Sequence, residues 1–162
     1  MGLAVTFWIM AVVTVAAALG VVFIRNVFRA ALMLILCFIA VAGIYITLSA
    51  DFLAAVQILV YVGAISVLII LAVMMTREVQ RGSPANKMEI PAAVVAAVLL
   101  GILIYTVTNT PWNIAAEAPL SPTTVPLATK LFSESGFILP VEIGAVLLLA
   151  AILGAIVITR EK

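Results

Sequence analysis

The stretch "AAVQILVYVGAISVLIILAVMM", residues 54–75, decides the fold class of this chain. It is long enough to cross a bilayer, because a spanning helix needs about 20 mostly apolar residues. A polar group inside hydrocarbon must find a partner within protein or water, so each polar residue in such a helix needs an explanation. Near the middle of this stretch stand Gln57, Tyr61, Gly63 and Ser66.

The rest of the chain is equally apolar. Hydrophobic residues make up 67% of it and charged residues 9%, with a mean hydropathy of +1.40. Soluble domains are roughly half apolar and about a quarter charged. The composition therefore predicts an integral membrane protein. The net charge of +1 speaks against a nucleic-acid partner, and the lack of histidine removes the commonest metal ligand, so no metal site is expected.

Five segments qualify as membrane-spanning helices, at about residues 3–24, 30–49, 52–75, 90–108 and 137–159. The first two connections are short, which predicts that the first three spans pack side by side and antiparallel. The connection at about residues 109–136 contains four prolines and cannot be a regular helix throughout, although a short interfacial helix is expected near residues 127–134. We expect one all-α membrane domain covering residues 1–162.

The basic residues predict the orientation of the spans. Seven of the eight lie in connections or termini on one side, and only Lys130 lies on the other. Since five spans put the termini on opposite faces, the amino end is predicted outside and the carboxyl end in the cytoplasm. The seven residues on the predicted cytoplasmic side are Arg25, Arg29, Arg77, Arg81, Lys87, Arg160 and Lys162.

Two carboxylates stand at or within predicted spans. Glu142 follows Pro140 near the outer end of the fifth span. It could be a proton-linked carboxyl or the partner of a basic group on a neighbouring subunit. The interpretation favoured by its position is that it reaches out to water near the headgroups or caps backbone N–H groups near the helix start. Asp51 is predicted to be the N-cap of the third span.

The spacing of the polar residues in the third span permits an irregular turn. Gln57 and Tyr61 are four residues apart and share one helix face, whereas Ser66 is five residues further on and leaves that face in a straight α-helix. One π-turn would bring Ser66 back, and Gly63 stands where such a turn is easiest. The alternative is that these residues serve only helix packing.

No motif for independent chemistry is present in the sequence: it has no GxGxxG, Walker loop, CxxC or nucleophile paired with a base. One intramembrane carboxylate and few polar partners are too sparse for a complete transporter. The residues alone therefore indicate a five-span subunit of a larger assembly.

Residues 50–75, "ADFLAAVQILVYVGAISVLIILAVMM", closely resemble the third span of subunit J of proton-pumping NADH–quinone oxidoreductase, respiratory complex I. Its counterparts are mitochondrial subunit 6 and the G-type subunit of cyanobacteria and plastids. The core of that family's signature is the string at residues 57–64. Residues 138–160, "ILPVEIGAVLLLAAILGAIVITR", resemble the family's second signature, and "RNVFRAALMLI" at residues 25–35 also fits.

The resemblance implies a π-bulge that forms or straightens as the enzyme changes state, and so opens or closes a water-filled path. This bulge would comprise Tyr61, Val62, Gly63 and Ala64. The polar residues of the third span would face neighbouring subunits. Gln57 departs from relatives that have glutamate there and cannot relay a proton. Gln57, Ser66, Glu142 and Asp51 are the expected polar or hydration residues.

The same resemblance implies a subunit without an active site of its own in a proton-translocating NADH:quinone oxidoreductase of the cytoplasmic membrane. The complex would use FMN, iron–sulfur clusters and a quinone, none of them bound by this chain. The implied partners are the lipid bilayer and the membrane subunits H, A, K and N. Of these, H carries the quinone site, A and K are small, and N is antiporter-like.

Two alternatives remain open from the sequence. The chain could be a small subunit of a related multisubunit cation/proton antiporter or membrane hydrogenase, or a purely structural assembly protein. The electron donor of the complex could be NADH, reduced ferredoxin or a deazaflavin.

Overall fold

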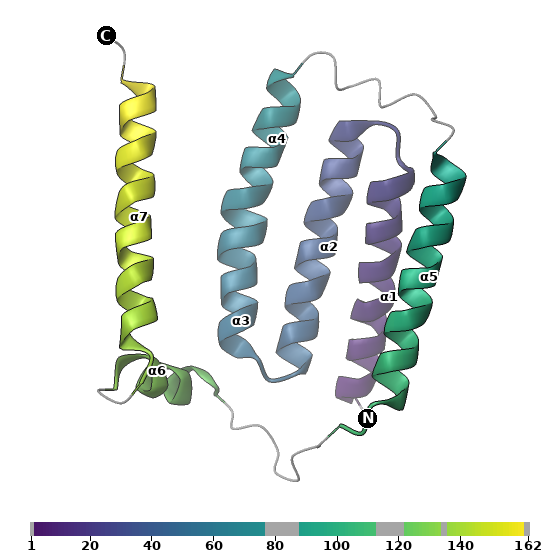
Figure 1. The fold of residues 1–162 in the computed structure, drawn as a ribbon, viewed down its shortest axis with the longest axis horizontal. Coiled ribbons are helices and arrows are strands. Elements are labelled where there is room, and N and C mark those ends of the chain that lie inside the picture. The colour runs from purple at the N-terminus through teal and green to yellow at the C-terminus, as the bar shows by residue number, and fades with distance from the viewer. Residues whose placement is uncertain (1, 77–87, 113–121, 134–135, 161–162) are drawn as a thin grey trace.

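A computed structural model describes residues 2–76, 88–112, 122–133 and 136–160, and among these residues every regular element is helical (Figure 1). This confirms the all-α prediction. In chain order the elements are α1 (Gly2–Phe23), α2 (Val27–Thr47), α3 (Asp51–Val56), the π-helix η1 (Gln57–Ile65), α4 (Ser66–Met75), α5 (Glu89–Asn109), α6 (Thr124–Phe132) and α7 (Ile138–Thr159).

The five predicted spans are confirmed. Five helices are long and apolar enough to cross a membrane, with α3, η1 and α4 forming one continuous span over Asp51–Met75. Most boundaries agree with the prediction within one or two residues. The exception is α2, which begins three residues earlier because Asn26 is its N-cap. The side chain of Asn26 accepts a hydrogen bond from the backbone N–H of Arg29 at 3.1 Å.

The first three spans pack side by side, as predicted, with α2 between α1 and the third span (Figure 1). Small residues let α1 and α2 approach closely. A Cβ at Gly43 would lie 2.9 Å from the sulfur of Met10, and one at Gly20 would lie 3.2 Å from Cγ of Met33. Each methionine therefore occupies the space that a larger residue would need.

The turn between α2 and α3 corrects the prediction for Asp51. Ser49 has a left-handed backbone, with φ of 58°, and the N–H of Ala50 donates to the carbonyl of Tyr45 at 2.9 Å. The third span therefore begins one residue earlier than predicted. The Ala50 carbonyl accepts its first helical hydrogen bond, from the backbone N–H of Ala54. Ala50 is the N-cap, and Asp51 is the first helical residue and makes no capping bond.

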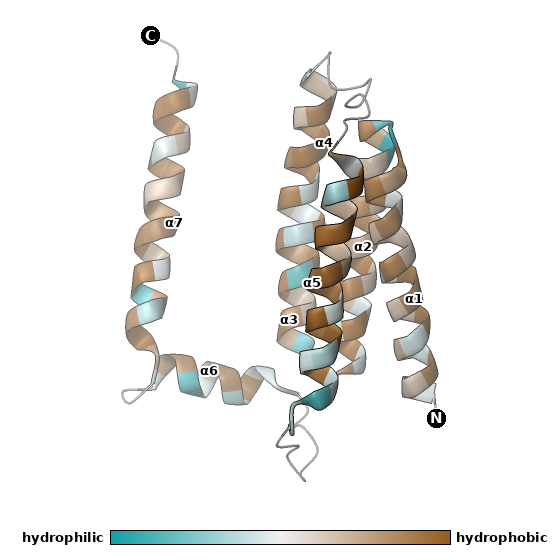
Figure 2. Ribbon diagram, turned by 45° about the vertical axis from the view of Figure 1, so that its right-hand side comes forward, coloured by the Kyte–Doolittle hydropathy of each residue, from teal (hydrophilic) through white to brown (hydrophobic). Residues whose placement is uncertain are grey.

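The remaining spans, α5 and α7, are exposed along their lengths. None of the residues in their apolar windows is buried, and α7 stands apart from the α1–α4 group (Figures 1 and 2). Figure 2 shows that both helices are largely hydrophobic. Such surfaces have the composition that lipid or other membrane subunits cover.

The expected interfacial helix is confirmed as α6, which begins three residues earlier than predicted and lies across the direction of the spans (Figure 2). It packs on the start of α7, and the N–H of Phe137 donates to the carbonyl of Lys130 at 3.0 Å.

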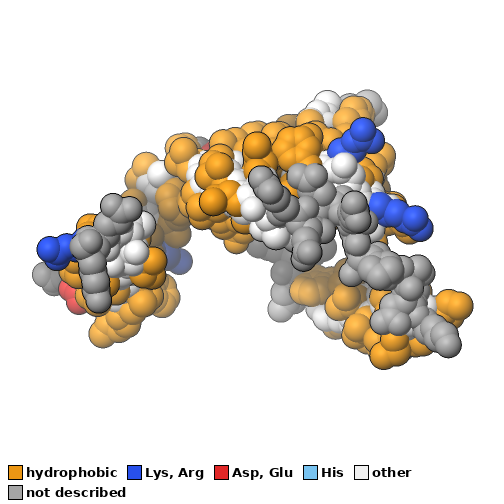
Figure 3. Space-filling view, turned by 90° about the horizontal axis from the view of Figure 1, so that it is seen from above, with side chains coloured by type: hydrophobic (Ala, Val, Ile, Leu, Met, Phe, Trp, Pro, Cys, Tyr) orange, Lys and Arg blue, Asp and Glu red, His pale blue; other side chains and the backbone are white. Residues whose placement is uncertain are grey.

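The two termini lie at opposite ends of the molecule (Figure 1). The connection that carries Arg25 lies at the same end of the molecule as the carboxyl end of α7, which Arg160 follows directly in the sequence. The helix α6, which carries Lys130, lies at the other end. Figure 3 views the former end, with basic side chains at its margin. Arg77, Arg81, Lys87 and Lys162 lie outside the described residues. Which end faces the cytoplasm stays a prediction.

Candidate functional site in the third span

The third span changes its winding in the middle. Residues Gln57–Ile65 are π-helical, with α-helix before and after them. At the carboxyl end of η1, the backbone N–H of Ser66 donates to the carbonyl of Tyr61, five residues earlier. The predicted irregular winding is thus confirmed. It contains Tyr61, Val62, Gly63 and Ala64 and extends beyond them on both sides.

Ser66 fits this winding through its side chain as well. Its hydroxyl donates to the same Tyr61 carbonyl at 2.6 Å, and the residue is only 2% exposed. Helical hydroxyls ordinarily reach the carbonyl three or four residues earlier, as those of Thr14 and Thr106 do here. The five-residue reach of Ser66 therefore reflects the local π register.

Gln57 and Tyr61 both meet one residue of α2, Phe38. The side-chain nitrogen Nε2 of Gln57 donates to the Phe38 carbonyl at 3.5 Å, and Gln57 is 7% exposed. The rings of Tyr61 and Phe38 pack edge to face, with centroids 5.5 Å apart and planes at 66°. Phe38 carries no polar side-chain atom, so no signal in the sequence pointed to it.

These contacts correct the prediction that the polar residues of the third span face neighbouring subunits. Gln57 and Ser66 are buried within the chain, and Gln57 bonds to α2, so neither faces a neighbouring subunit. The physical reason is that an amide or hydroxyl facing hydrocarbon would lack a partner, and a carbonyl of the same chain lies within reach. Gly63 and Ala64 are instead exposed, and Tyr61 remains 42% exposed.

No close contact requires a glycine at position 63. A Cβ at this position would lie 3.4 Å from the carbonyl oxygen of Ile58, which is an ordinary van der Waals distance. Alanine therefore fits the π winding. A valine adds two methyl groups at the same place, beside that carbonyl.

The two carboxylates lie outside this site. Asp51 is exposed and begins α3, six residues before Gln57, or about 9 Å along the helix. Glu142 is exposed near the start of α7, where the N-cap is Phe137 and no side chain caps the helix. The capping alternative for Glu142 is therefore wrong.

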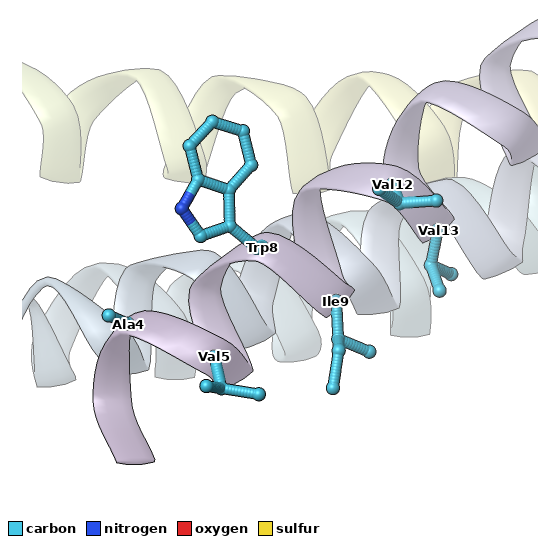
Figure 4. Close-up of a pocket in the computed structure, with 6 residues that line it drawn as sticks. All are labelled: Ala4, Val5, Trp8, Ile9, Val12 and Val13. Carbon is cyan, nitrogen blue, oxygen red and sulfur yellow. The ribbon is translucent and has the colours of Figure 1, made fainter. Parts of the chain in front are cut away.

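An apolar groove of about 490 Å³ lies elsewhere, along α1. Figure 4 shows its lining side chains, with Trp8 projecting on one side. Apart from the indole nitrogen of Trp8, its lining side chains carry no polar atom to orient a substrate. Within the described parts of the chain, no three His, Cys, Asp or Glu residues gather as a metal site would require. The lining residues of the groove are Ala4, Val5, Trp8, Ile9, Val12 and Val13.

Residues 17–158 match the family model described as NADH-ubiquinone/plastoquinone oxidoreductase chain 6. The chain belongs to this family. The match includes all of η1 and the position of Glu142, so the resemblance based on the third and fifth spans is confirmed.

Three curated relatives align with most of the chain. The NAD(P)H-quinone oxidoreductase chain 6 of Leptolyngbya boryana is 39% identical over 161 residues, covering 98% of this chain and 80% of its own length. The F(420)H(2) dehydrogenase subunit J of Methanosarcina mazei is 37% identical over 160 residues, covering 96% of this chain and 90% of its own length. The chloroplastic NAD(P)H-quinone oxidoreductase subunit 6 of Nephroselmis olivacea is 38% identical over 148 residues, covering 89% of this chain and 85% of its own length.

Proposed function

We propose that η1 is a conformational gate that couples quinone reduction to proton translocation in a complex I-type NADH:quinone oxidoreductase. Family membership and five apolar spans make the chain a multi-pass membrane subunit of a NAD(P)H–quinone oxidoreductase complex. Relatives named as oxidoreductase or dehydrogenase subunits favour this function over the antiporter alternative.

The observation that supports the gate is the π winding in the middle of a span. Converting one π-turn to an α-turn shifts the hydrogen-bond register by one residue and turns one half of the helix by about 100° relative to the other. The Ser66 N–H would then move from the Tyr61 carbonyl to that of Val62. The rotation would carry the exposed Tyr61 and Gly63 to new positions against whatever packs there.

Polar groups at η1 give water a place to bind when the helix turns. The Gln57 amide, the Ser66 hydroxyl and a carbonyl released during rewinding could each hold a water molecule, and a buried water needs two to four such partners. Because an amide does not titrate at working pH, Gln57 would take part in hydration but not carry a proton. Proton transfer steps would therefore belong to water and to other subunits.

The redox groups of the complex would lie on other subunits. The described residues of this chain contain no group of three His, Cys, Asp or Glu residues that could ligate iron. FMN, iron–sulfur clusters and the quinone would be bound elsewhere. The exposed faces of α5 and α7 would pack against lipid and the membrane subunits H, A, K and N.

The gate is tested by comparing Gly63→Val with Gly63→Ala in the intact complex. Valine crowds the Ile58 carbonyl in the π winding, whereas alanine fits, so only valine should disturb the balance between windings. In sealed inverted vesicles, we expect Gly63→Val to lower protons pumped per quinone reduced by about twofold or more. Gly63→Ala should keep the wild-type ratio. An unchanged ratio in an assembled Gly63→Val complex would count against a gate here.

A further inference from the structure

We propose that Phe38 of α2 is the positioning residue that holds η1 in its π winding; this inference rests on the proposed gate. Phe38 is half-buried and meets the π-segment twice, through its backbone carbonyl at Gln57 and through its ring at Tyr61. The two contacts lie at parts of η1 that behave differently when the helix rewinds.

The contact with Gln57 lies at the fixed end of the segment. Gln57 is the first residue of η1, and its backbone N–H still bonds to the carbonyls of Leu53 and Ala54 in the α-helix before it. Rewinding the residues that follow leaves this boundary in place. The hydrogen bond from Gln57 therefore keeps α2 and the start of η1 in register in both windings.

The contact with Tyr61 lies in the part that moves. Tyr61 stands four residues after Gln57, within the turns that would convert, and its ring meets Phe38 at a centroid distance of 5.5 Å. A rotation of even part of 100° about the helix axis would separate the two rings. The aromatic pair is thus made in the π winding and lost in the α winding, so it favours the π winding.

The size of this preference follows from the aromatic pair. An edge-to-face aromatic pair stabilises the state that contains it beyond the effect of its buried area. Losing the pair shifts the equilibrium between the two windings by about two- to tenfold. Phe38→Leu keeps an apolar side chain and the backbone carbonyl that accepts from Gln57, and it removes only the ring. It should therefore shift η1 towards the α winding without releasing the start of the segment from α2.

The test is a set of density maps of the intact complex under turnover, with particles sorted by the winding of the third span. We expect Phe38→Leu to raise the ratio of α-wound to π-wound particles by about two- to tenfold. Tyr61→Phe, which keeps the ring, should leave the ratio unchanged. In a Tyr61→Leu background, Phe38→Leu should cause no further shift.

Phe28→Leu is the matched control. Phe28 belongs to the same helix, is 41% exposed and lies ten residues, or about 15 Å, from Phe38. It should leave the ratio at the wild-type value. Should Phe38→Leu not assemble, Phe38→Met, also apolar and non-aromatic, carries the same expectation.

Two failures can be told apart. Both windings present, with the same ratio in Phe38→Leu and wild type, would overturn the role of Phe38 and leave the gate standing. A π-wound helix in every particle class of every variant would overturn the gate, and the role of Phe38 with it.

Discussion

The carbonyl oxygen of Tyr61 accepts two hydrogen bonds from one residue, Ser66: one from its backbone N–H and one, at 2.6 Å, from its hydroxyl. Both donors reach back five residues, so backbone and side chain agree on the π register. Ser66 is also among the most deeply buried residues of the described chain. These facts make Ser66, at the junction of η1 and α4, the position of the third span where substitution has the clearest expected effect on stability.

Ser66→Ala removes the hydroxyl bond and leaves the backbone bond in place, so we expect a loss of about 1 kcal/mol in stability. Ser66→Leu must also fit a larger side chain into a position that is only 2% exposed, and overpacking of this kind costs about 1–3 kcal/mol. The midpoint of thermal inactivation of the membrane-bound complex should fall in the order wild type, Ser66→Ala, Ser66→Leu. Thr106→Val, which removes an exposed hydroxyl, serves as the control and should change little. Equal midpoints for wild type and Ser66→Leu would contradict the packing described for this residue.

Gly136 should not tolerate a side chain. A Cβ there would collide with the backbone carbonyl of Lys130, which also accepts the N–H of Phe137 where α6 meets α7. Because backbone atoms cannot move aside as a flexible side chain can, Gly136→Ala should destabilise this corner by about 1–3 kcal/mol. The amount of the chain recovered in the assembled complex should fall.

Gly144→Ala is the control for this prediction, because a Cβ at Gly144 meets nothing within 4 Å. Its recovery should equal that of the wild type. Equal recovery of Gly136→Ala and Gly144→Ala would show that the corner between α6 and α7 is not as tight as described.

The orientation can be tested by labelling single cysteines. In a Cys37→Ala background, Thr124→Cys lies at the exposed first residue of α6, and Arg160→Cys lies just after α7, at the other end of the molecule. The excess of basic residues predicts that a membrane-impermeant thiol reagent added to intact cells labels the first and spares the second. Labelling of Arg160→Cys from outside would reverse the orientation.

The spans could be predicted from the sequence because bilayer thickness fixes their length, and unbroken apolar runs of that length are easy to recognise. The spacing of the third span only permitted a π winding, because Ser66 leaves the face shared by Gln57 and Tyr61 unless one extra residue is absorbed. The π winding itself was predicted from the family resemblance of residues 50–75. Residues 127–132 could be predicted as helical because they follow the last proline of the connection, Pro126, and contain none themselves.

The side chains that surround η1 could not be predicted in the same way. The partner of Gln57 is a backbone carbonyl of α2, and backbone groups leave no trace in the sequence. Phe38 is one phenylalanine among the seven of an apolar chain, and nothing marks it until α2 and η1 are placed together. The left-handed Ser49 is a conformation that a non-glycine residue adopts uncommonly, so the early start of α3 was missed.

The most direct test of the gate is the winding of residues 57–65 in density maps of the wild-type complex, at rest and during turnover. If η1 is the gate, the segment is π-wound in one state, with Tyr61 against Phe38. In the other state it is α-wound and turned by about 100°, with water beside Gln57 and Ser66. The same winding in both states, with no water beside these residues in either, would contradict the gate.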